Sequence, residues 1–139
     1  MKLQDKVVIV TGGGSGAGAA IVDSCVAEGA HVIAIGRDPA KLQATCEAAG
    51  NNAHAEAGDV TDRDRVQQIV DGVIAEYGRV DILVNNAGIN VADRSLETLT
   101  PEDWDRVIDI NATGAFNTIH AVLPHMRTQA DGVVIAVSS

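Results

Sequence analysis

Residues 11–18, Thr-Gly-Gly-Gly-Ser-Gly-Ala-Gly, have the composition of a phosphate-binding loop. They follow an apolar run over residues 6–10 and lead into small and apolar residues at helical spacing over 16–28. Glycine permits positive φ and lets a ligand approach the backbone, and a helix start points unpaired N–H groups at an anion. No Gly-Lys-Ser/Thr sequence follows, so backbone dipoles and not a lysine would hold the phosphate. The alternative is a tight strand-to-helix turn that binds no ligand.

Strand and helix patterns alternate along the rest of the chain and would position this loop. Short β-branched or apolar runs predict strands over residues 6–10, 31–35, 53–57, 81–84 and 133–137. Helices are predicted over 16–28 and 42–49, from Thr61 as the N-cap to Tyr77, and from Thr100 to about Met126. Glycines at 29, 50 and 78 would end the first three helices, and Pro124 marks a kink or the end of the fourth.

This alternation predicts an α/β fold, a doubly wound parallel sheet of the Rossmann type with about five strands. The chain of 139 residues is long enough for one domain, and neither a linker nor an internal repeat divides it. The last predicted strand reaches the final residues, where an uncovered strand edge would invite pairing with other chains. We therefore expect a single domain over residues 1–139 that lacks its C-terminal strands.

Composition and charge exclude several classes of function. The net charge of −9 argues against binding to nucleic acid or to anionic membranes, which both attract clustered Lys and Arg. No run approaches the roughly 18 apolar residues of a membrane span, and residues 7–10 are too few for a secretory signal. Cys25 and Cys46 lack Cys-x-x-Cys spacing, and no histidine pairs with a carboxylate or cysteine at ligand spacing. We expect reduced thiols, no metal site and a cytoplasmic protein.

Several short motifs follow one another along the whole chain. The pattern Thr-Gly-x-x-x-Gly-x-Gly is met by Thr11, Gly12, Gly16 and Gly18, and Asn-Asn-Ala-Gly is met by residues 85–88. Asp59-Val60 follows the third predicted strand, Asn111 lies in the long helical region, and Ser138-Ser139 closes the chain. In this order and at these separations the motifs resemble those of the short-chain dehydrogenase/reductase family. The resemblance implies hydride transfer between NAD(P)(H) and the alcohol or carbonyl group of a small molecule.

The resemblance also implies a role for each matching residue. Gly12, Ser15, Gly16 and Gly18 would shape the pyrophosphate site, and Asp59 and Val60 would hold the adenine. Asn85, Ala87 and Gly88 would line the cofactor ribose region, while Asn86 would brace the central sheet. Ser139 would be the catalytic residue that hydrogen-bonds the substrate oxygen, and Asn111 would order the water-and-backbone part of a proton relay. Asn111 could instead be a helix-kink residue, and Asn86 a buried structural asparagine.

The choice between NADP(H) and NAD(H) depends on the residues that end the second predicted strand. An acid there favours the free ribose hydroxyls of NAD, and an Arg nearby accommodates the 2′-phosphate of NADP. Alignment with the family puts Gly36 at the acidic position and Arg37 directly after it, which favours NADP(H). Asp38 opposes this preference, since a register shift would place its carboxylate on the ribose or let it neutralise Arg37. Ser15 gives the glycine loop no second cation.

The family's proton donor is a tyrosine in a Tyr-x-x-x-Lys motif beyond the serine, and these 139 residues contain no such motif. The only tyrosine, Tyr77, falls on a different helix and is expected in the core. Two hypotheses follow. The residues belong to a complete oxidoreductase, or they form a catalytically inactive dinucleotide-binding fragment without the general acid–base contribution of about 10²–10⁴-fold. The resemblance further implies a homo-oligomer, a dimer or tetramer formed through the long helix, here Trp104–His125, and through the next helix of the family, which these residues lack.

Overall fold

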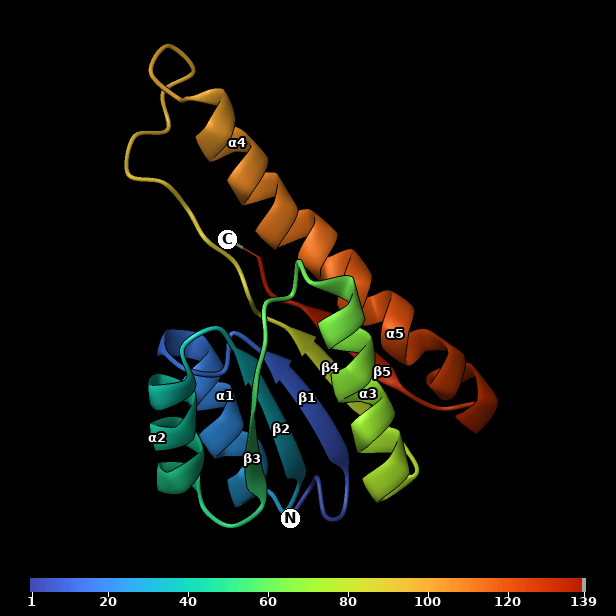
Figure 1. The fold of residues 1–139 in the computed structure, drawn as a ribbon. Coiled ribbons are helices and arrows are strands. Elements are labelled where there is room, and N and C mark those ends of the chain that lie inside the picture. The colour runs from blue at the N-terminus through green and yellow to red at the C-terminus, as the bar shows by residue number, and fades with distance from the viewer. Residues whose placement is uncertain (139) are drawn as a thin grey trace.

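A computed structural model describes residues 1–138 and shows one parallel sheet in the order β3-β2-β1-β4-β5 (Figure 1). The strands are β1 (Val7–Thr11), β2 (His31–Gly36), β3 (Ala53–Ala57), β4 (Ile82–Asn85) and β5 (Val133–Ala136). The helices are α1 (Gly16–Ala27), α2 (Pro39–Ala49), α3 (Arg63–Tyr77), α4 (Pro101–Ile108), the π-helical turn η1 (Asp109–Thr113) and α5 (Gly114–Gln129). The predicted doubly wound α/β fold with five strands is confirmed.

Helices cover both faces of the sheet, with α1 and α2 on one side and α3 and α5 on the other (Figure 1). Val7 and Ile9 of β1 face the α3 and α5 side, whereas Val8 and Val10 face the α1 and α2 side. Successive side chains of a strand point to opposite faces, so a strand covered on both sides is apolar at every position. This is why β1 appears in the sequence as a continuous apolar run.

The strand order creates a switch point beside β1. From β1 the chain moves outward through β2 to β3, then returns to the other edge of β1 with β4 and continues to β5. The connections therefore leave the carboxyl ends of β1 and β4 in opposite directions, and the crevice between them is where open α/β sheets bind ligands. Figure 1 shows the segment after β4 leading away from the sheet to α4.

Two local predictions were wrong. Thr61 does not cap α3, because its hydroxyl donates to Asp59 Oδ1 at 2.8 Å, and Asp62 is the N-cap that accepts from Arg65 N at 3.0 Å. Pro124 neither ends the long helical region nor marks its interruption. It lies within α5, which continues to Gln129 and ends at Ala130 in the left-handed conformation, and the interruption is at η1.

A buried carboxylate joins β1 to β4 at the opposite end from the crevice. Asp81, 4% exposed, accepts a hydrogen bond from Val7 N at 2.9 Å and two from Arg79 Nε at 2.9 and 3.0 Å, and Lys6 Nζ lies 3.5 Å away. Burial raises the pKa of Asp81, but the bonds from Arg79 and Val7 and the charges of Arg79 and Lys6 outweigh it. The pKa of this carboxyl is therefore held below its ordinary value.

We predict that Asp81→Asn destabilises the protein by about 2 kcal/mol at pH 7, because charge-assisted bonds from Arg79 and the Val7 amide are lost. A carboxyl whose folded pKa is depressed contributes stability above its unfolded pKa, about 4, and loses that contribution as pH falls through the folded pKa. Urea unfolding of both proteins between pH 7 and pH 3 should show a difference that shrinks toward low pH. A difference independent of pH would contradict the ionic role of Asp81.

Candidate functional site

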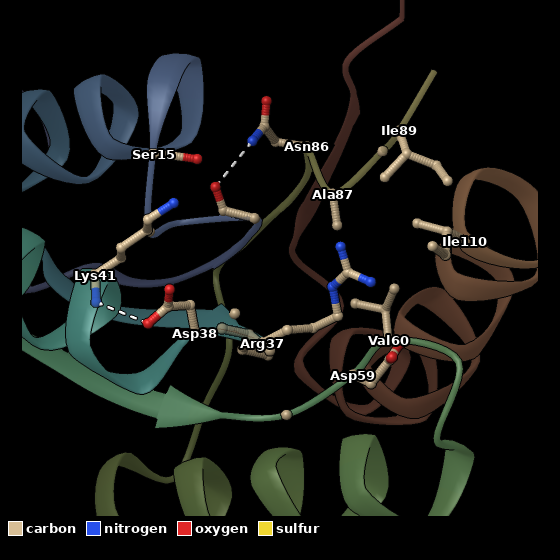
Figure 2. A pocket seen from close by; sticks show the side chains of 16 residues that line it. Ser15, Arg37, Asp38, Lys41, Asp59, Val60, Asn86, Ala87, Ile89 and Ile110 are labelled. Carbon is tan, nitrogen blue, oxygen red and sulfur yellow. Dashed lines mark hydrogen bonds between the residues drawn. The ribbon is translucent and has the colours of Figure 1, made fainter. Parts of the chain in front are cut away.

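A pocket of about 410 Å³ lies at the carboxyl ends of β1, β2, β3 and β4 (Figure 2). Each of these strands contributes the loop that follows it, and α2 and η1 each contribute one side chain. The size is within the range of small-molecule and cofactor sites. The lining residues are Gly12, Gly14, Ser15, Ile35, Gly36, Arg37, Asp38, Lys41, Gly58, Asp59, Val60, Asn86, Ala87, Gly88, Ile89 and Ile110.

The glycine loop brings the start of α1 to one side of this pocket. Gly12 and Gly16 have φ of +66° and +52°, which side chains rarely adopt. Ser15 is the N-cap of α1 but makes no side-chain capping bond, and no acidic residue occupies the first turn. The helix start therefore presents amide groups without a competing protein anion, an arrangement suited to phosphate.

The closeness of α1 to the loop depends on Gly18. A Cβ built on Gly18 would lie 1.9 Å from the Gly12 carbonyl oxygen and 2.6 Å from Asn86 Nδ2. Gly16 and Gly18 do not line the pocket themselves. Their part in the structure is to shape the backbone around it.

Hydrogen bonds from the segment after β4 fix the glycine loop. Asn86 Nδ2 donates to the carbonyl oxygens of Thr11 at 3.2 Å and Gly12 at 3.3 Å, and Figure 2 shows the second of these bonds. Thr11 Oγ1 accepts from Asn86 N at 3.0 Å and Ala87 N at 2.9 Å. Asn86 thus braces β1 against β4, as the sequence predicts.

Asn85 departs from its predicted position in the ribose region. It is 7% exposed and is not among the pocket-lining residues, and its Oδ1 accepts from Thr118 Oγ1 of α5. Its Nδ2 has no partner among the described residues. Neighbouring residues at a strand end point to opposite faces, so Asn85 and Asn86 do not both face the crevice.

Two cations and one acid stand where β2 leads into α2. Asp38 Oδ1 accepts from Ala40 N at 3.1 Å and Lys41 N at 3.2 Å, so the carboxylate caps α2. Within residues 1–138 Arg37 forms no ion pair, so Asp38 does not neutralise it. Figure 2 shows the Arg37 guanidinium inside the pocket and the Lys41 side chain extending toward Ser15.

Sequence reasoning missed Lys41. The Asp38 cap with Pro39 at the helix start was the available signal, because it fixes the first turn of α2 and so the direction of Lys41.

The segment after β3 forms another part of the pocket wall. Asp59 Oδ1 accepts from Thr61 N at 2.9 Å and Thr61 Oγ1 at 2.8 Å. Val60 is 6% exposed and packs on Gly114, where a Cβ would lie 2.4 Å from Val60 Cγ2. Both Asp59 and Val60 line the pocket.

Asn111 lies in the π-helical turn and contacts the loop after β4. Its Oδ1 accepts from Ile89 N at 2.8 Å, and its Nδ2 donates to Ile89 O at 2.9 Å. Gly88 passes close beside it, since a Cβ there would lie 3.3 Å from Asn111 Oδ1. Asn111 therefore occupies the helix interruption and also holds the loop. Ser139, the predicted catalytic serine, lies outside the described residues.

Among residues 1–138 there is no group of three or more His, Cys, Asp or Glu side chains that could hold a metal ion. None of the helices in this part of the chain is both long enough and apolar enough to cross a membrane.

Comparisons with known proteins agree with this geometry. The sequence model described as short chain dehydrogenase matches residues 6–139. A 3-oxoacyl-(acyl-carrier-protein) reductase FabG of Thermotoga maritima is 41% identical over 142 residues, which cover all of this chain and 57% of that protein. A short-chain reductase of Streptomyces niveus is 41% identical over 98% of this chain and 53% of its own length.

A solved structure of a metagenomic short-chain oxidoreductase in complex with NADP superposes with a TM-score of 0.93 at 36% identity. It covers all of this chain, which in turn covers 64% of that protein. The chain thus spans less than two thirds of the length of these relatives.

We predict that Gly18→Ala destabilises the protein by about 3 kcal/mol or more, because the added methyl group overlaps the Gly12 carbonyl and nothing beside it can move freely. Gly72→Ala in α3 is the matched control, since a Cβ there meets no atom within 4 Å. In that helix interior the same substitution should stabilise by about 0.5–1 kcal/mol. Equal urea midpoints for the two variants would refute the close packing at Gly18.

Proposed function

Because the chain belongs to the short-chain dehydrogenase family, we propose that residues 1–139 form one domain whose pocket binds a nicotinamide dinucleotide. The whole protein would then transfer a hydride between the nicotinamide and the alcohol or carbonyl carbon of a small-molecule substrate. The observation that carries the proposal is the meeting of the α1 start, Arg37 and the Asp59–Val60 wall in a single pocket. A tight turn without a ligand would not require this convergence.

The residues that form the pocket fit a nicotinamide dinucleotide. Gly12, Ser15 and the α1 start would hold the pyrophosphate, with Gly16 and Gly18 shaping the turn. Asp59 and Val60 would hold the adenine, and Ala87 and Gly88 would border the ribose beside the nicotinamide. When bound, the nicotinamide supplies or accepts the hydride.

We further propose that the cofactor is NADP(H) rather than NAD(H). Asp38 is engaged at the α2 cap and leaves Arg37 without an acidic partner among the described residues. Lys41 adds a second positive charge to the pocket lining, with its side chain extending toward Ser15. An extra phosphate on the adenosine ribose would meet both cations, whereas the free hydroxyls of NAD would leave them without an anion.

These 139 residues do not contain a side chain that fits the role of proton donor in the family reaction. Ser139 would polarise the substrate oxygen, and Asn111 would hold the Ile89 backbone and so the loop beside the nicotinamide. Tyr77 does not fit the role of acid, because its ring packs between His31 and His54 at centroid distances of 5.3 and 6.5 Å. Burial and the neighbouring Glu76 raise the pKa of Tyr77, and Asp81 stands four positions later where the motif requires lysine.

The lack of a proton donor favours a second candidate function. On their own, the 139 residues would be an inactive fragment that binds the dinucleotide. We predict that the purified chain binds NADPH but reduces carbonyl compounds at least about 10²–10⁴-fold more slowly than a complete family enzyme. Calorimetric titration would measure binding, and NADPH absorbance with a panel of ketones and aldehydes would measure turnover. Failure to bind would overturn the nucleotide site, and rapid turnover would overturn the fragment hypothesis.

For the cofactor preference, we predict that Arg37→Met and Lys41→Met each weaken binding of adenosine 2′,5′-bisphosphate about tenfold. Each removes a charge-assisted contact to the ribose phosphate, typically about 1.5–3 kcal/mol. Affinity for 5′-AMP, which lacks that phosphate, should change less than about twofold. Lys2→Met, which removes an exposed lysine at the N-terminus, controls for net charge. Equal losses for both nucleotides would count against NADP(H).

We also propose a homo-oligomeric assembly and a cytoplasmic location for the protein. Trp104, Ile108 and Phe116 are 54%, 43% and 53% exposed along the α4–α5 region, an apolar surface that a second copy would cover in a homo-oligomer. Cys25 and Cys46 are free thiols, and burial raises the pKa of both, which fits a protein of the reducing cytoplasm.

A further inference from the structure

Asn117 is a buried amide whose hydrogen-bonding groups are used at both ends. It lies on α5 with 2% of its surface exposed. Its Nδ2 donates to Val60 O at 2.9 Å, and its Oδ1 accepts from Arg63 Nε at 3.1 Å. A polar side chain buried this deeply carries a desolvation cost that these two bonds offset.

The Val60 carbonyl that it binds belongs to the wall of the nucleotide pocket. Val60 and Asp59 line that pocket, and Gly114 allows α5 to approach Val60 closely enough for Asn117 to reach the backbone. The Val60 carbonyl is therefore directed toward α5 and away from the pocket.

The peptide unit between Val60 and Thr61 is held from both sides. A trans peptide is planar, so its carbonyl and its N–H point in opposite directions. Asn117 binds the carbonyl, and Asp59 Oδ1 accepts from Thr61 N at 2.9 Å on the other side. Rotation of this peptide would break both bonds together.

The clamp also orients the Asp59 carboxylate. All of its hydrogen bonds within residues 1–138 are made by Oδ1, with Thr61 N and Thr61 Oγ1. Oδ2 is left as an acceptor on a side chain that lines the pocket. A carboxylate oxygen of this kind can accept a hydrogen bond from the exocyclic amino group of adenine.

We infer that Asn117 is a positioning residue for base recognition: by fixing the Val60–Thr61 peptide it sets the Asp59 carboxylate for the 6-amino group of adenine. The inference rests on the proposed nucleotide site. A residue that only joined α5 to α3 through Arg63 would affect stability without affecting which base is preferred.

The readout is the ratio of affinities for 5′-AMP and inosine 5′-monophosphate, which differ at the 6-position and share the ribose and phosphate. Asn117→Asp keeps an acceptor for Arg63 Nε but replaces the donor to Val60 O with an oxygen. The unsubstituted chain should prefer 5′-AMP by about tenfold, the size of one hydrogen bond to a charged group, and the variant should show a ratio close to one. Ribose 5-phosphate should bind both proteins within about twofold.

Arg63→Met is the matched control, because it removes the other partner of the same amide and leaves the bond to Val60. It should lower the urea midpoint while retaining the AMP preference. Thr61→Val tests the orientation of the Asp59 carboxylate without changing a buried amide, because it removes the bond from Thr61 Oγ1 to Asp59 Oδ1, and it should reduce the preference about threefold. If Asn117→Asp does not fold, the AMP preference of Thr61→Val is the measurement that tests the inference.

The inference fails if Asn117→Asp, or Thr61→Val in its place, retains the full preference for 5′-AMP, or if Arg63→Met loses it. In either case binding of 5′-AMP by the unsubstituted chain would leave the nucleotide site intact. Absence of binding for all three ligands would instead overturn the proposed site, and the role of Asn117 with it.

Discussion

The junction of β1 with β4 is the constraint on which the pocket depends. The strand order sends the connections after β1 and β4 to opposite faces, so no helix covers the sheet edge between them. Thr11 and Asn86 bridge this gap with backbone and side-chain hydrogen bonds, and Asn86 reaches the Gly12 carbonyl as well. The pocket is therefore bounded by atoms that the sheet itself holds in place. Arg37, Lys41 and Asp59 are placed relative to this fixed edge.

The pocket also has an electrostatic character different from that of the whole molecule. The chain carries a net charge of −9, yet Arg37, Lys41 and the start of α1 bring positive potential to one small volume. Screening at physiological ionic strength limits the reach of distant surface charges to about 8 Å. The local groups therefore set the potential inside the pocket, while the overall acidity disfavours the approach of extended polyanions more than that of a small phosphate ester.

Sequence alone predicts the features that depend on neighbours along the chain. Local sequence patterns explain the apolar run of β1, the helical periodicity of α3 and the glycine loop. These patterns are sufficient to predict the fold and the glycine-loop part of the pocket. The capping role of Asp62 was missed because Thr61 is also a residue type found at N-caps, and the bond from the Thr61 hydroxyl to Asp59 takes Thr61 out of that role. The roles of Lys41 and Asn117 depend on segments distant in sequence. Within residues 109–113 only Asn111, as a possible helix-kink residue, pointed to an interruption, and its π-helical form was not predicted. The alternation of side chains along a strand predicts that Asn85 and Asn86 face opposite sides. The prediction for Asn85 followed the motif match instead.

The central place of β1 has a consequence for the order in which the molecule folds. Of the five strands, β1 is synthesised first, and β2 can pair with one edge of β1 soon after it. The other edge of β1 pairs with β4, and the hydrogen bond from Val7 N to Asp81 joins residues 74 positions apart in the sequence. Closing so long a loop carries an entropic cost before its contacts form, so topologies of this kind fold slowly. The glycine loop has its bracing from Asn86 only after that closure, so the pocket takes its final form only once β4 has paired with β1.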